Sequence, residues 1–97
     1  MITMMQFNEK VMKDAIKKYG KTSQLMMLFE ETSELQKEVC KAERGFNNQE
    51  NIAEEMADVY IMLEQIKMIY KISNNDVRYW IDEKTRRLER RLEKEEK

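Results

Sequence analysis

The run SQLMMLFEETSELQKEVCKAE, residues 23–43, decides the fold of this chain. Its apolar and small side chains recur every three or four residues, the spacing that places them on one face of an α-helix. Those positions are Leu25, Leu28, Thr32, Leu35, Val39 and Ala42. Thr22 or Ser23 can cap the start, and Gly45 stands where a helix commonly ends. The run therefore predicts one long amphipathic helix.

The rest of the chain shows helical spacing on both sides of this run. Further helices are predicted over about residues 5–18, 50–71 and 75–95. The chain has no proline and only two glycines, so few positions interrupt a helix. A length of 97 residues fits one domain with a small core. We therefore expect an all-α, four-helix bundle-like subunit over residues 1–97, which assembles with partner chains.

Charge and composition narrow the functional classes. Residues 1–83 hold 11 basic and 15 acidic side chains, net −4, whereas residues 84–97 hold 7 basic and 4 acidic, net +3. An acidic body lacks the basic footprint of most nucleic-acid binders. The absence of histidine, with Cys40 as the single cysteine, excludes a Cys/His zinc site and a Ser-His-Asp triad. Because neither a bilayer-spanning run nor a signal peptide is visible, we expect a cytoplasmic protein that binds no membrane.

Two pairs of carboxylates stand at i,i+3 spacing in the second and third predicted helices. They are Glu31 with Glu34, and Glu55 with Asp58. Residues so spaced are neighbours on a helix surface, and a helical wheel places all four at the border of the apolar stripe. Their negative charges repel one another, and a divalent cation would remove that repulsion. The alternative is a solvated acidic edge that pairs with nearby lysines.

The motif Glu30-Glu31-x-x-Glu34, followed after twenty residues by Glu55-x-x-Asp58, resembles the metal signature of the MazG-like, all-α nucleotide pyrophosphohydrolases. Residues 26–31 and 55–65 are similar to small bacterial and phage members of that family. The resemblance implies Mg²⁺-dependent hydrolysis of a (deoxy)nucleoside triphosphate to the monophosphate and pyrophosphate by a metal-activated water, with Mn²⁺ as a substitute metal. It also implies that Glu31, Glu34, Glu55 and Asp58 are the catalytic metal ligands, in a homodimer or homotetramer.

A straight antiparallel hairpin turning near residue 48 conflicts with this ligand set. It would place Glu34 opposite residue 62, about 10 Å from Glu55 along the helix axis. Glu38 would instead face Asp58. Glu38 is therefore a candidate further ligand or supporting group, with a surface salt bridge as the alternative, and Glu30 is a candidate supporting group. The four carboxylates converge only if the second helix ends early and the connection climbs back, or if the helices depart from straight pairing.

A bound triphosphate needs cationic partners besides a metal. Lys37 lies near the acidic stripe, and Lys84 and Arg87 share a face of the last predicted helix. We expect these three side chains to contact phosphate, from the same chain or a neighbouring one. The alternative for Lys84 and Arg87 is a cationic helix end that complements the helix dipole.

Two other functions fit the sequence. Phosphoribosyl-ATP pyrophosphohydrolases have similar acidic helices, although the local resemblance favours the smaller phage and bacterial group. The heptad-like run over residues 23–43 and the charged C-terminal stretch also fit a non-enzymatic oligomerisation or adaptor module.

Overall fold

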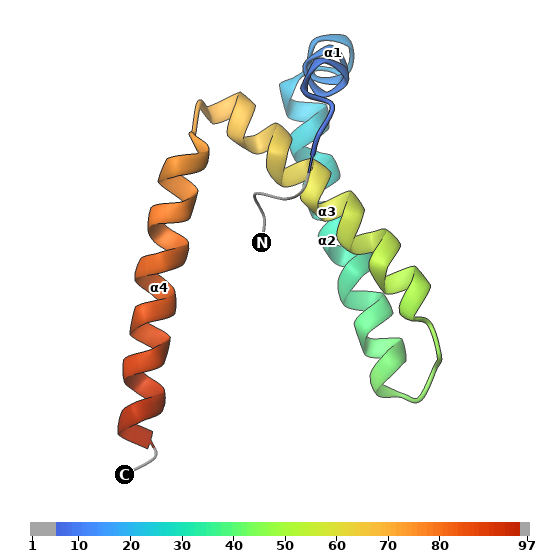
Figure 1. Cartoon of the computed structure of the whole chain (residues 1–97). Helices are drawn as coiled ribbons and strands as arrows, with labels where there is room; N and C mark the ends of the chain where they lie inside the picture. Colours follow the sequence, from blue (N-terminus) through green and yellow to red (C-terminus); the bar gives the residue numbers. More distant parts are fainter. Residues whose placement is uncertain (1–5, 96–97) are drawn as a thin grey trace.

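The structure of the chain, a computed structural model, describes residues 6–95. This part of the chain folds into four helices: α1 (Glu9–Tyr19), α2 (Lys21–Glu43), α3 (Gln49–Tyr70) and α4 (Asn74–Glu95). The predicted all-α, four-helix, bundle-like class is confirmed. In Figure 1, α2 and α3 lie side by side as an antiparallel hairpin, and α1 packs against both helices. α4 leaves the end of α3 and extends away from the hairpin. None of the helices described is both long and apolar enough to cross a membrane.

The junction between α1 and α2 is tighter than the sequence predicted. Gly20 ends α1, where its backbone N–H donates to the Ile16 carbonyl at 2.9 Å, and α2 begins at the next residue. Its φ of +93° is one that glycine adopts without steric strain, so no linker is needed. Thr22 and Ser23, the predicted caps, consequently lie inside the first turn of α2.

The start of α1 is set by a side-chain cap. The Asn8 side-chain oxygen accepts a hydrogen bond from the Val11 backbone N–H at 3.2 Å, so the helix begins at Glu9. The predicted start near residue 5 was therefore too early, since residues 6–8 are not helical. Residue 5 itself lies outside the described residues.

The connection from α2 to α3 runs back along α2 before α3 begins. Gly45, with φ of +98°, follows α2, and Phe46 N–H and Gly45 N–H donate to the carbonyls of Lys41 and Ala42. This is the Schellman pattern expected of a glycine just beyond a helix end. The Asn48 side-chain nitrogen then donates to the backbone carbonyl and the carboxylate of Glu38, at 2.9 and 2.8 Å. The chain has therefore returned by more than one turn when α3 starts at Gln49.

α4 is a well-capped helix with little packing against the rest of the chain. Ser73 Oγ accepts from Asp76 N–H at 3.1 Å, and the Asp76 carboxylate accepts from Ser73 N–H at 3.2 Å, which is a reciprocal capping box. Within residues 74–95 no side chain is buried. Over the described chain, the buried apolar side chains are Met12 and Met62, both in the region where α1, α2 and α3 meet. The packed core of a single chain is therefore small.

Candidate metal centre

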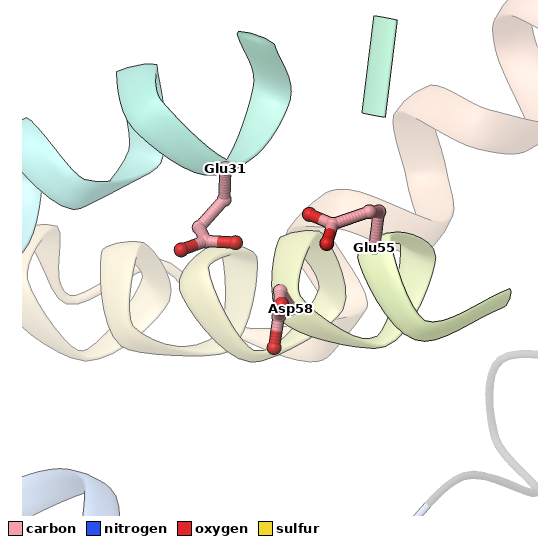
Figure 2. Close-up of side chains that lie close together, drawn as sticks. All are labelled: Glu31, Glu55 and Asp58. Atoms are coloured by element: carbon pink, nitrogen blue, oxygen red, sulfur yellow. The ribbon is translucent and has the colours of Figure 1, made fainter. Parts of the chain in front are cut away.

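Three of the four predicted carboxylate ligands converge between α2 and α3. Glu31, Glu55 and Asp58 each offer one oxygen, and these oxygens lie within 4.8 Å of one another. Figure 2 shows the Glu31 side chain extending from α2 toward α3, which carries Glu55 and Asp58. All three side chains are half-buried. The sequence motif thus brings acidic groups from two helices to one place, and they form the acidic cluster discussed below.

The helix register explains this convergence. Gln24 pairs with Gln65 across the hairpin, and two turns along each helix Glu31 meets Asp58. The same register sets Glu34 at the level of Glu55. It arises because the chain folds back at Asn48, so α2 extends past the start of α3. The axial mismatch expected for a straight hairpin is therefore absent. The connection climbs back along α2 as one alternative predicted, although α2 ends at Glu43, its expected end, and not early.

The cluster is electrostatically unfavourable without a cation. Burial raises the pKa of Glu31, and so do a hydrogen bond with Asp58 and the negative charges of Asp58 and Glu55. Burial also raises the pKa of Glu55, with Asp58 and Glu34 as the leading repulsive charges. One oxygen of Glu55, Oε2, is buried and has no hydrogen-bond partner among the described residues. Buried polar atoms of this kind normally have a partner.

Glu34 and Glu30 lie at the edge of this arrangement. Both side chains are exposed, and Glu34 is not among the three carboxylates whose oxygens lie together. Their charges still reach the cluster, because Glu34 contributes to the raised pKa of Glu55 and Glu30 to that of Glu31. Glu34 as a ligand and Glu30 as a supporting group stay predictions.

Glu38 is held by its own partners instead of joining the cluster. Its side chain is 7% exposed, accepts the Asn48 hydrogen bond, and forms a salt bridge with Lys41 at 3.5 Å. The Asn48 hydrogen bond lowers the pKa of Glu38, and the positive charge of Lys41 lowers it further. Glu38 is therefore ionised and fixes the connection that sets the register. Its negative charge adds to the repulsion acting on Glu55.

The predicted phosphate-binding cations do not gather at the cluster within one chain. Lys37 is exposed on α2, on the same helix as Glu31. Lys84 and Arg87 belong to α4, which extends away from the hairpin (Figure 1). The Arg87 guanidinium instead lies 6.0 Å from the Trp80 ring centre on its own helix. Lys84 and Arg87 can serve this site only from a second copy of the chain or after a rearrangement of α4.

A pocket of about 470 Å³ opens directly beside the acidic cluster. Glu31 and Asp58 line one part of it, and the paired amides of Gln24 and Gln65 line another. Sequence reasoning did not single out these glutamines. The signal that could have found them is their spacing, since each lies seven residues from an acidic motif residue on the same helix face.

Neither the models of protein families, nor the curated proteins, nor the solved structures contain a match to this chain.

Proposed function

We propose that this protein is a Mg²⁺-dependent nucleoside triphosphate pyrophosphohydrolase that releases a nucleoside monophosphate and pyrophosphate. The observation that carries the proposal is the convergence of Glu31, Glu55 and Asp58 from two separate sequence motifs. Glu31 is more than twenty residues away from Glu55 and Asp58 in the sequence, and it is the register of the hairpin that brings the three side chains together. A nearby pocket large enough for a small molecule adds to this support.

The donor set fits a hard divalent cation. Mg²⁺ prefers carboxylate oxygens and keeps open positions for water and substrate phosphates, and Mn²⁺ accepts the same ligands. Glu31, Glu55 and Asp58 would hold it, and the unpartnered oxygen of Glu55 would gain a partner. Glu34, one turn from Glu31, is the proposed fourth ligand. Bound metal supplies neutralisation of phosphate charge and a water of lowered pKa.

The residues around the cluster have separate roles in this proposal. The carboxylates would hold the cation to which the phosphate chain binds, and a carboxylate oxygen can accept a hydrogen bond from the attacking water and so hold it in place for its approach to phosphorus. Burial of their side chains lowers the local dielectric, which strengthens the attraction between the bound ion and phosphate. Lys37, on the surface of α2, attracts the polyphosphate electrostatically.

A second copy of the chain completes the proposed enzyme. α4 exposes apolar side chains, including Leu88 at 45% and Leu92 at 51%, and it carries Lys84 and Arg87. The C-terminal part of α4, residues 84–95, holds six basic and three acidic side chains, which suits the acidic hairpin of another copy, where the two cations would reach phosphate. The proposed assembly is a cytoplasmic homodimer or homotetramer.

The test is a panel of ribo- and deoxyribonucleoside triphosphates with Mg²⁺, with both products identified. We expect pyrophosphate and a monophosphate from wild type, and at least a hundredfold loss in Glu55→Gln and Asp58→Asn, on the order of the loss when a group that stabilises the transition state is removed. Glu54→Gln is the matched control, because Glu54 is exposed next to Glu55 and outside the cluster. Inactivity of the wild type on the whole panel would refute the proposal.

A helical adaptor is the second candidate, favoured by the exposed apolar face of α4. A metal that binds only the folded state must raise the melting temperature. An unchanged melting temperature at millimolar Mg²⁺, together with an inactive panel, would favour the adaptor.

Phosphoribosyl-ATP is assayed as a separate substrate beside the nucleotide panel, so that the related phosphoribosyl-ATP pyrophosphohydrolase activity is tested directly.

A further inference from the structure

The pocket beside the acidic cluster contains a second polar feature. Gln24 on α2 and Gln65 on α3 are 6% and 4% exposed, and Gln24 Nε2 donates to Gln65 Oε1 at 2.7 Å. Both side chains line the pocket of about 470 Å³ that Glu31 and Asp58 also line. The two pairs are two helical turns apart, which is about 10 Å along the helices. The pocket therefore joins a charged end to a neutral, hydrogen-bonding end.

The glutamine pair retains unused hydrogen-bonding capacity. A primary amide has two N–H donors and an oxygen acceptor with two lone pairs, and the single bond between the side chains uses only part of this. The Gln24 oxygen and the Gln65 nitrogen take no part in that bond. Side chains buried to this degree normally find partners for such atoms. One acceptor and one donor therefore remain outside the bond between the two side chains, on residues that line the pocket.

The other walls of the pocket suit a flat, partly apolar ring. Met27 on α2 and Ile61 and Met62 on α3 contribute apolar surface, and methionine adapts readily to a ring face. Tyr19, at the end of α1, lines the pocket with a side chain that is 60% exposed. An aromatic ring at the rim can stack on a base.

We propose that this pocket binds the nucleobase of the substrate and that Gln24 and Gln65 are the residues that hydrogen-bond to its edge. The proposal rests on the proposed function, which places the triphosphate at the acidic cluster. The ribose then spans the two turns between the cluster and the glutamine pair. The Watson–Crick edge of a base presents neighbouring donors and acceptors, which complement the free amide oxygen and nitrogen.

The pairing of Gln24 with Gln65 also predicts that the pocket accepts several different bases. If both amides rotate by half a turn together, Gln65 becomes the donor to Gln24, and the order of donor and acceptor in the pocket is reversed. Amino bases and oxo bases present opposite orders of donor and acceptor. One site can therefore accept ATP, CTP, GTP and UTP.

The experiment compares the Gln24→Met/Gln65→Met double variant with wild type on these four nucleotides and on inorganic tripolyphosphate. Replacing both amides removes the hydrogen bonds to the base without leaving either amide unpaired. We expect KM for every nucleotide to rise about tenfold or more with kcat little changed, and the kinetics with tripolyphosphate to stay at the wild-type level. Gln36→Met is the control, because Gln36 is exposed on the same helix.

A second variant, Gln65→Glu, tests the donor and acceptor assignment. A carboxylate only accepts, so Gln24 must donate to it and two acceptors remain for the base. We expect kcat/KM to shift toward GTP, whose base offers adjacent donors, and away from UTP. Unchanged KM values in the double variant, or an equal rise for tripolyphosphate, would overturn this inference while nucleotide hydrolysis stands. Wild type inactive on every nucleotide would overturn the proposed function and this inference together.

Discussion

The hydrogen bond between Gln24 and Gln65 makes a stability prediction that does not depend on any enzymatic activity. Each single change, Gln24→Met or Gln65→Met, leaves the partner amide more than nine-tenths buried without its 2.7 Å hydrogen bond. An unpaired buried amide costs about 1–3 kcal/mol of unfolding free energy. In a domain of this size, each kcal/mol lowers the melting temperature by about 4–8 °C. The double variant has no unpaired amide, and two methionines fill a similar volume, so its stability should be close to that of wild type.

The assay is urea unfolding of wild type, the two single variants and the double variant at one protein concentration. A fixed concentration matters because assembly would shift the midpoints. We expect a coupling energy of about 2–6 kcal/mol between the two positions, because each single change costs about 1–3 kcal/mol and the double change costs little. Gln36→Met, at an exposed position of α2, should unfold with the wild-type midpoint. If the loss of unfolding free energy in the double variant equals the sum of the losses in the two single variants, the two amides do not depend on each other, and the pairing seen in the structure is wrong.

Three further predictions follow from the charges and surfaces described above. Because the pKa of Glu31 and the pKa of Glu55 are raised in the folded state, unfolding free energy without metal should fall as pH rises from about 4.5 through the raised values. Glu55→Gln should flatten this decline and raise the melting temperature at pH 7 in EDTA; a variant no more stable than wild type there would contradict the repulsion. Asn48→Ala should destabilise the hairpin, and since Asn48 lowers the pKa of Glu38, the loss should be largest above about pH 4.5 and fade as pH falls through the lowered value. Equal losses at pH 7 and at the acid end of a melting series would argue against that hydrogen bond. Leu88→Glu should convert the proposed oligomer into a monomer in light scattering, because it places a charge on the exposed apolar face of α4; an unchanged mass would exclude this face from the interface.

The helical architecture was predictable because its determinants are local. Apolar spacing, the scarcity of helix breakers and Gly45 located α2 and α3 to within a few residues. The start of α1 was missed because the Asn8 cap competes with helical spacing that continues upstream. The place where α2 begins was missed because Gly20 turns the chain within a single residue. The separation of α4 from the hairpin depends on tertiary contacts, which periodicity does not report.

The candidate site was predictable in its residues but not in its geometry. Glu31, Glu55 and Asp58 were identified from spacing and resemblance, and the structure brings them together. Their common level depends on the side chain of Asn48 reaching Glu38, a contact between residues on two different segments. Glu38 was a candidate further ligand or supporting group with a surface salt bridge as the alternative, and the structure shows the salt bridge with Lys41 and the hydrogen bond from Asn48. The glutamine pair was overlooked because uncharged amides on helices are common and carry no motif.

The Asn48 connection also determines how this protein can change over evolution or in the laboratory. Surface connections usually tolerate added or removed residues well. By contrast, one residue inserted within α3 between Gln49 and Glu55 would rotate the α3 side chains that follow it by about 100° and advance them by about 1.5 Å relative to Asn48 and α2. The acidic cluster and the amide pair would then be lost together, even though each helix could still form. The spacing from Asn48 to Gln65 is therefore under strict constraint, in addition to the identities of Gly45 and Asn48, and the far end of α4 is the safer place to add a tag or a fused domain.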